Sequence, residues 1–189
     1  GDAALVVVAT PTFLHRHQAA AAVAAGCHML VEKPVGDSSA GLDSVADAAE
    51  QAETQVARTD VVGRWMATCR AVRTWARANP HEYALIFGSP IPGYAAPQDT
   101  IDPAARIPAL LLAVLSDSVA AGRAVVELGV PLPRVVRSDL TAVRREAAPG
   151  IDDVAMARAV TAWTLLIGSI RFELFGHLHN VIHDYAAHF

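Results

Sequence analysis

The chain has almost no lysine: Lys33 is the single lysine among its 15 basic residues, and the others are arginine. Charged residues make up only 18% of the 189 residues, and the formal net charge is −4. That balance leaves no basic excess to face phosphate groups, so it argues against nonspecific binding to nucleic acid. Hydrophobic residues reach 53%, which excludes a disordered chain and is ample for a buried core.

Cysteine and long apolar runs are also scarce. The two cysteines, Cys27 and Cys69, lie far apart in no metal or redox spacing, which predicts reduced, buried thiols in a cytoplasmic protein. The longest apolar runs, such as residues 110–115, are far shorter than the roughly 20 residues that a membrane span needs, so no membrane partner is expected. No signal-like segment opens the chain, and its first strand-like run begins so early that we expect a beginning to be missing.

The first part of the chain alternates strand-like and helix-like segments. Residues 5–9 form an apolar, β-branched run typical of a strand buried on both faces, and residues 15–25 predict a helix that ends at Gly26. Residues 28–31 predict a second strand, and a further helix runs to about residue 55. This β-α-β-α order is typical of a parallel sheet covered by helices, although two strands alone do not make a stable sheet.

The rest of the chain has a helical pattern throughout, and the change falls near residues 55–63. A stretch rich in proline and glycine at residues 88–103 predicts a long loop. We therefore expect two domains, over residues 1–57 and 58–189. Within the second, the spacing of apolar residues predicts helices over 64–79, 81–87, 104–128, 134–146, about 152–175 and 178–189.

Short motifs in the first part resemble the Gfo/Idh/MocA oxidoreductases over about residues 2–55. They are Val6-Val-Val-Ala-Thr-Pro-Thr12, His15, Ala25-Gly26 and Val31-Glu-Lys-Pro34. The resemblance implies NAD or NADP bound at the C-terminal edge of a parallel sheet. It also implies that Lys33 serves hydride-transfer chemistry as the catalytic residue. The side chains that would line the cofactor or shape its turn are Thr10, Pro11, His15, Glu32, Lys33 and Pro34.

The first part lacks what such an oxidoreductase needs. A Gly-x-Gly-x-x-Gly turn would cradle the dinucleotide pyrophosphate at a helix N-terminus, and the chain has no such motif. The acidic residue that would hold the ribose and the second, substrate-binding domain are missing too. We therefore interpret residues 1–57 as a partial Rossmann-like segment without a cofactor, and the interpretation leans against an enzyme.

The second part resembles the C-terminal domain of TetR-type regulators over about residues 61–189. The motifs that carry the resemblance are Arg64-Trp65, Val72 to Ala76, Asn79 to Gly88, Ser89 to Pro97, Trp163 to Gly168 and Phe172 to His177. It implies an all-helical, homodimeric effector-binding domain whose last two helices pair in a four-helix bundle. The expected fold class is therefore mostly α: a TetR-like helical bundle preceded by a short, incomplete Rossmann-like β-α-β-α segment.

Aromatic side chains supply the candidate binding surface of the helical part. Ligand pockets are mostly apolar with a few convergent polar groups. We therefore predict that a small, largely apolar effector contacts Trp75, Tyr83, Phe87, Tyr94 and Trp163. The alternative is that the tryptophans, which stand at helical spacing, are simply core residues.

A histidine cluster near the C-terminus is the best metal candidate. His179 and His183 stand four residues apart, a spacing that lets two imidazoles on one helical face bind one ion. The glutamate of a zinc-protease motif is missing, because Asn180 stands in its place. We favour a solvated helix end, with histidines near its C-terminal dipole, and predict no metal site. The other members of the cluster are His177, Asp184 and His188.

The sequence as a whole predicts the effector-sensing and dimerising domain of a TetR-like transcriptional regulator. The implied mechanism is allosteric: ligand packing shifts helices and changes the spacing of two DNA-binding heads. The helix-turn-helix that would bind DNA is absent from this chain, so DNA binding is expected of the parent protein only. The expected partners are the small effector and a second copy of the chain, bound through the two C-terminal helices.

Two questions stay open at this stage. The alternative function is that of an NAD(P)-dependent oxidoreductase of Gfo/Idh/MocA type, or a non-functional remnant of one. The junction near residues 55–63 is compatible with a natural gene fusion, an engineered fusion or a joining error in the sequence.

Overall fold

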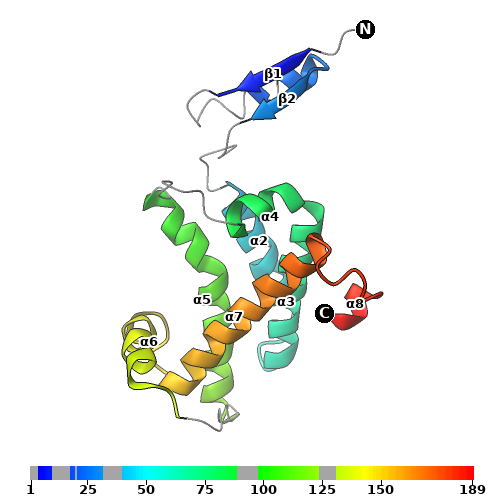
Figure 1. The fold of residues 1–189 in the computed structure, drawn as a ribbon. Coiled ribbons are helices and arrows are strands. Elements are labelled where there is room, and N and C mark those ends of the chain that lie inside the picture. The colour runs from blue at the N-terminus through cyan, green and yellow to red at the C-terminus, as the bar shows by residue number, and fades with distance from the viewer. Residues whose placement is uncertain (1–3, 10–17, 20, 32–39, 89–97, 124–130) are drawn as a thin grey trace.

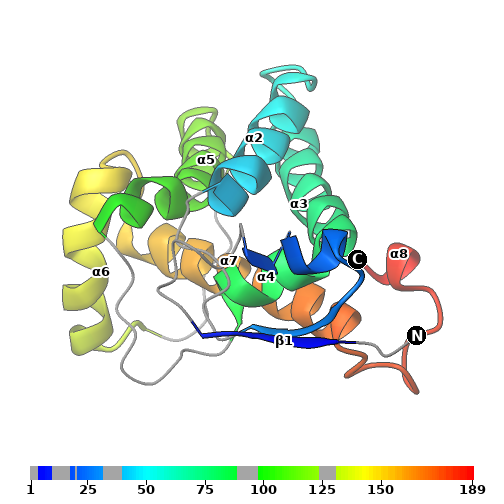
Figure 2. The same cartoon turned by 90° about the horizontal axis from the view of Figure 1, so that it is seen from above.

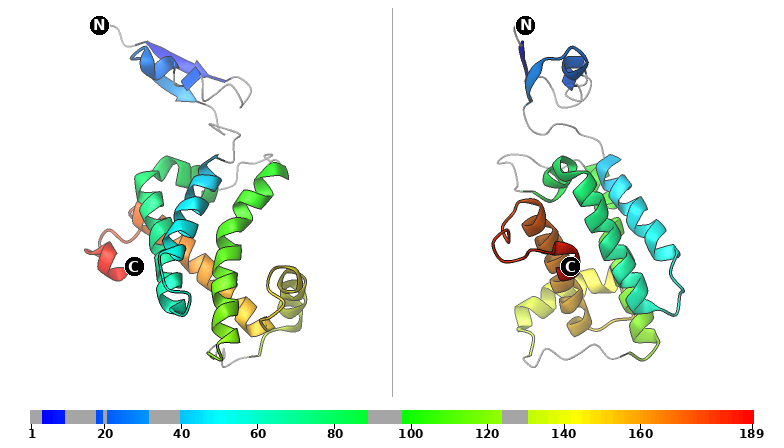
Figure 3. Two further views of the ribbon diagram at one scale, coloured as in Figure 1. Left: turned by 180° about the vertical axis from the view of Figure 1, so that it is seen from behind. Right: turned by 90° about the vertical axis from the view of Figure 1, so that its right-hand side faces the viewer.

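The structure, a computed structural model, describes residues 4–9, 18–19, 21–31, 40–88, 98–123 and 131–189. Two short strands come first and a helical unit follows, so the chain is mostly α, as the sequence predicts. Figures 1 and 3 show the strands beyond one end of the helices.

The two strands pair in parallel. β1 (Leu5–Val8) lies beside β2 (His28–Val31), and Leu5 is opposite His28. The chain between them is helical at residues 18–19 and 21–24. Gly26 follows with a φ of +69°, a left-handed conformation that glycine adopts without a steric penalty, which explains why the helix ends here.

The expectation that the first strand is buried on both faces is wrong. Leu5 is 66% exposed and Val7 is 58% exposed, whereas Val8 is only 2% exposed. A parallel strand becomes buried on both faces when further strands flank it and helices cover the sheet. The described residues supply one partner strand, so most of β1 stays accessible.

Three helices begin the helical unit, close to their predicted bounds: α2 (Ala40–Thr54), α3 (Val61–Ala78) and α4 (Pro80–Phe87). Asp60 caps α3, because its Oδ1 accepts a hydrogen bond from the Gly63 amide at 2.9 Å. Pro80 occupies the first turn of α4, where the missing N–H would have no helical partner in any case.

The second half contains α5 (Ile101–Ala120), which follows the 3-10 turn η1 (Gln98–Thr100), then α6 (Arg134–Ala147), α7 (Asp153–Leu174) and α8 (Tyr185–His188). α5 begins earlier than predicted and ends at Ala120 instead of continuing to residue 128, and Pro108 lies inside it. The helix predicted over residues 178–189 is reduced to α8. Gly176, with a φ of +70°, ends α7, and turns lead from there to α8.

The core lies where α2, α3, α4, α5 and α7 meet. Its buried side chains are Val45, Ala46, Ala49, Cys69, Val72, Trp75, Ala76, Tyr83, Ile107, Leu111, Leu166 and Ile170. A smaller cluster joins α5 to the start of α7, through Leu112, Ala148, Ile151, Ala155 and Met156. Figure 2 shows α6 at the opposite side of the helical unit from α3.

α2 packs on α3 and α5, although the sequence assigns it to the β-α-β-α segment. Val45, Ala46 and Ala49 of α2 have no exposed surface and belong to the main core. The turn between α2 and α3 contains the predicted domain boundary at residues 57 and 58. α2 therefore shares the core of the helical unit.

Among the residues that the structure describes, two helices, α5 and α7, are long and apolar enough to cross a membrane when judged by length and composition alone. That is weak evidence for a span, because the core helix of a soluble protein passes the same test. Both helices contribute buried side chains to the core. α5 also carries Arg106 and Asp117, which form ion pairs with other elements.

Candidate functional site

An aromatic cluster joins α4 to α7. The rings of Tyr83 and Phe87 lie 5.1 Å apart between centroids, and Phe87 meets Trp163 edge to face at 6.1 Å. Both separations fall in the favourable range for aromatic pairs. Tyr83 is fully buried, whereas Phe87 and Trp163 are only partly buried. The structure thus brings together three of the five side chains that the sequence predicts to contact an effector.

The Tyr83 hydroxyl has a structural partner. It donates a hydrogen bond to the backbone carbonyl of Ile167 on α7 at 2.7 Å. Burial raises the pKa of Tyr83 from 10.0 to about 12, against a smaller lowering by the charge of Arg171. The hydroxyl therefore stays neutral and ties α4 to α7.

Trp75 lies on the other side of the core, against α2. Its indole Nε1 donates a hydrogen bond to the Ser44 hydroxyl at 2.9 Å. An open depression of about 570 Å³ runs along this contact and is lined by Ala40, Asp43, Ser44, Asp47, Ala48, Gln51 and Trp75. Tyr94, the fifth predicted contact residue, lies outside the described residues.

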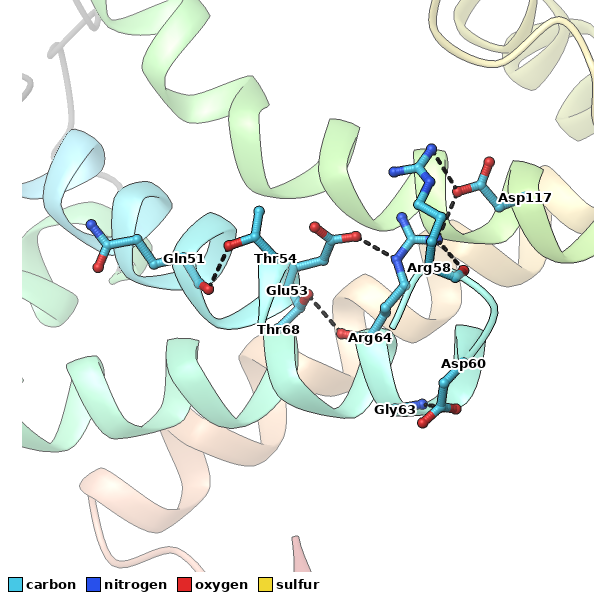
Figure 4. A network of polar contacts seen from close by, with 9 residues as sticks. All are labelled: Gln51, Glu53, Thr54, Arg58, Asp60, Gly63, Arg64, Thr68 and Asp117. Carbon is cyan, nitrogen blue, oxygen red and sulfur yellow. Dashed lines mark hydrogen bonds and ion pairs between the residues drawn. The ribbon is translucent and has the colours of Figure 1, made fainter. Parts of the chain in front are cut away.

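Arg64 is a buried charge that the sequence analysis did not single out for a role. Its side chain is 1% exposed, donates from Nε to Glu53 of α2, and donates from Nη1 to Asp117 of α5 at 2.7 Å (Figure 4). Burial alone lowers the pKa of Arg64, but the hydrogen bonds with Asp117 and Glu53 more than offset it, so the pKa is raised. A charged guanidinium thus links α2, α3 and α5.

The sequence contains a signal for this burial. Arg64 precedes Thr68 by four residues and Val72 by eight, and both are fully buried. Residues at that spacing share one face of a helix. An arginine on the apolar face of a helix requires carboxylate partners, because an unpaired buried charge is very costly.

Arg73 and Glu173 form a second ion pair, between α3 and α7, that the sequence did not suggest. Arg73 donates from Nε and Nη2 to the two carboxylate oxygens of Glu173, at 2.6 and 2.8 Å. The Arg73 guanidinium also lies over the ring of Phe189, 5.1 Å from its centroid. This contact fastens the last residue of the chain to the helical unit.

The C-terminal histidines do not share a helical face. His179 and His183 lie in the turns before α8, so the helical spacing inferred from the sequence does not apply. Asp184 caps α8, and its Oδ1 accepts hydrogen bonds from the amides of Ala186 and Ala187 at 3.0 Å. Within the described ranges, no group of three or more His, Cys, Asp or Glu side chains is placed to hold a metal ion.

The oxidoreductase motif falls largely outside the described residues. This holds for every predicted cofactor contact: Thr10, Pro11, His15, Glu32, Lys33 and Pro34. The described part provides one strand pair and no glycine-rich turn of the kind that holds a pyrophosphate.

Comparison with family models confirms both resemblances. The model described as the tetracyclin repressor-like, C-terminal domain matches residues 65–189. The model described as the oxidoreductase family, NAD-binding Rossmann fold, matches residues 2–59. The oxidoreductase match ends just before α3 and the regulator match begins within the first turns of α3.

Individual proteins similar to the chain are regulators. They include the HTH-type transcriptional regulators Mb1846 of Mycobacterium bovis and MT1864 and Rv1816 of Mycobacterium tuberculosis. Each is 33% identical over 143 residues, which cover 71% of this chain and 59% of the relative. The chain thus spans about three-fifths of the length of these curated relatives.

A solved structure supports the same assignment. The crystal structure of a regulatory protein, SCO4313, matches with a TM-score of 0.55 and 31% identity, covering 79% of this chain and 64% of that chain. Residues 65–189 alone make up less than 79% of this chain. The superposition with SCO4313 therefore also includes residues before residue 65. The oxidoreductase alternative is not favoured, because these relatives are regulators. Through the domain at residues 65–189, the chain belongs to the TetR family of transcriptional regulators.

Proposed function

We propose that the helical unit is the effector-sensing and dimerising domain of a transcriptional regulator, and that its effector is a small, largely apolar molecule. Membership of a regulator family supports the sensing role. The aromatic cluster of Tyr83, Phe87 and Trp163 carries the proposal about the effector, because it offers apolar surface between two helices.

The roles of the aromatic residues differ in this proposal. Phe87 and Trp163 are only partly buried, so their rings remain available to a ligand. Tyr83 is buried and hydrogen-bonded to Ile167, so it forms a wall that holds the site in place. Trp75 is bound to Ser44 on the other side of the core and is not part of this site. A ligand wedged against Phe87 and Trp163 would change the packing of α4 on α7.

That change in packing is the proposed signal. An effector regulates only if it binds one arrangement of the helices better than another.

We place DNA contacts of the parent regulator outside the helical unit, and we place the regulator in the cytoplasm. The relatives are named as HTH-type regulators, and the chain matches only 59% of their length.

Dimerisation is proposed through α7. The exposed face of this helix carries Leu165 and Phe172, which are 63% and 45% exposed. Gly168 lies between them on the same face, where an added Cβ would meet open space. Exposed apolar side chains around a small residue are suited to close packing of a second helix. α8 is too short to contribute much, so α7 is the main dimer helix in this proposal.

N-phenyl-1-naphthylamine, a neutral dye that fluoresces in apolar surroundings, tests the proposed site. We expect saturable binding to the intact chain, and we expect Phe87→Leu to weaken it about fivefold, since one aromatic contact is worth about 1 kcal/mol. Val135→Ala, which also removes apolar surface but from the exposed side of α6, where Val135 is 67% exposed, is the control and should leave the affinity unchanged. Equal affinities for the chain and the Phe87→Leu variant would place the dye elsewhere and contradict the proposed site.

A further inference from the structure

We infer that α3 and α5 form a docking groove for an amphipathic helix with a small apolar face and an acidic edge, and that α2 fills this groove. The family model for the Rossmann fold includes α2, because it matches residues 2–59. Physically, α2 belongs to the regulator domain. The sequence junction and the folding boundary are therefore different places in the chain.

The apolar face of α2 fits the groove because its side chains are small. Val45, Ala46 and Ala49 are completely buried against the core residues of the neighbouring helices. Small side chains let two helix backbones approach closely. Gly41 extends the fit toward α4, where an added Cβ would lie 3.1 Å from Glu82 Oε2 and 3.2 Å from Ile86 Cδ1.

The acidic edge of α2 meets a single arginine of α5. Arg106 donates to both carboxylate oxygens of Glu50, at 3.0 and 2.8 Å. It also reaches Asp47 at 2.5 Å and Asp43 at 3.2 Å. These carboxylates lie three or four residues apart, so they form one row along the helix. One guanidinium thus fixes the rotation of α2 about its own axis.

Two further polar contacts fix α2 along its length. Near its start, Ser44 accepts the indole hydrogen bond of Trp75. Near its end, Glu53 is buried and accepts from Arg64 (Figure 4). Trp75 and Arg64 both belong to α3, so one neighbouring helix contacts α2 through two residues about three turns apart along α3.

Occupation of the groove has a consequence for the strands. A helix that covers a parallel sheet must turn its apolar face toward that sheet. α2 has buried its apolar face on α3 and α5, and Leu5 and Val7 of β1 remain exposed. The apolar face of α2 can pack on either the helices or a sheet, but not on both at once. Packing of α2 in the groove therefore excludes it from covering a Rossmann-type sheet.

Hydrogen exchange followed by mass spectrometry on the full chain tests this inference. We expect amides of α2 to exchange as slowly as those of α3, and both to exchange much more slowly than those of β1 and β2. Arg106→Gln removes the partner of the acidic edge, so it should speed exchange in α2 at least tenfold while changing α3 less. Arg145→Gln, an exposed arginine of α6, is the matched control and should change neither helix.

Two results would overturn the inference. One is exchange of α2 at the rate of the strands in the unmodified chain. The other is unchanged exchange of α2 in Arg106→Gln. If Arg106→Gln unfolds the whole chain, the double variant Asp47→Asn with Glu50→Gln gives the same readout, because it alters only side chains that are 57% and 42% exposed.

Discussion

Arg73 of α3 and Glu173 of α7 hold each other through two parallel hydrogen bonds, although 100 residues separate them in the chain. Both side chains are 11% exposed, so the pair is largely removed from water. Arg77 reaches the same carboxylate at 3.4 Å. Such a fork of guanidinium on carboxylate fixes geometry as well as supplying energy. It sets how α7 crosses α3 near the end of the helical unit.

Glu173→Gln should destabilise the chain by about 2 kcal/mol, because it leaves the guanidinium of Arg73 buried without a countercharge. Urea unfolding monitored by circular dichroism at 222 nm measures the loss. Glu146→Gln on the exposed surface of α6 is the control and should change the free energy of unfolding by less than about 0.5 kcal/mol. Equal stabilities for Glu173→Gln and the unmodified chain would show that the pair contributes nothing.

Tyr83→Phe should lower the free energy of unfolding by about 1 kcal/mol, because it removes the hydrogen bond to Ile167 and keeps the ring. Tyr185→Phe is the matched control. The Tyr185 hydroxyl is buried and finds no hydrogen-bond partner among the residues that the structure describes, so its removal should cost little. Thermal unfolding of the two variants side by side measures the difference, and a larger loss in Tyr185→Phe would contradict it.

Stability should fall as the pH rises above about 9. Burial raises the pKa of the Cys69 thiol from 9.0 to about 11, and that of Tyr83 from 10.0 to about 12. The unfolded chain therefore releases these protons at lower pH than the folded chain does. Their contribution is fully present below pH 9 and is lost as the pH approaches 11 to 12.

Urea unfolding at a series of pH values measures this decline, and Cys69→Ala should reduce its slope between pH 9 and 11.

The thiols also offer a direct comparison at pH 8. Cys27 is only partly buried and Cys69 is buried, so iodoacetamide should label Cys27 first. Faster labelling of Cys69 would contradict the burial of its thiol.

Leu165→Glu should shift the chain from dimer to monomer without unfolding it. The substitution places a charge in the centre of the proposed dimer face of α7, where Leu165 is exposed in the single chain. Light scattering after size-exclusion chromatography distinguishes the mass of 19.9 kDa from twice that value. Val143→Glu, on the exposed surface of α6, is the control. A chain that is monomeric before any substitution would contradict the proposed dimer.

Local features of the sequence determined the helices and the family. Pro80 and Gly26 act on their own stretches of backbone, so their effects can be predicted without knowing what packs nearby. Asp60 likewise caps α3 through an amide three residues away. The regulator motifs that fall in the described residues lie within single helices and their flanking turns, which is why they could be identified in the sequence. The family model over residues 65–189 confirmed the resemblance.

Tertiary structure alone decided which partners these segments have. The apolar face of α2 predicts a buried helix, but small apolar side chains do not specify whether a sheet or other helices bury them. The acidic edge receives its partner from Arg106, some sixty residues later in the chain. Likewise, the run at residues 5–9 has the composition of a buried strand, and yet Leu5 is exposed, because burial depends on layers that a strand cannot encode by itself.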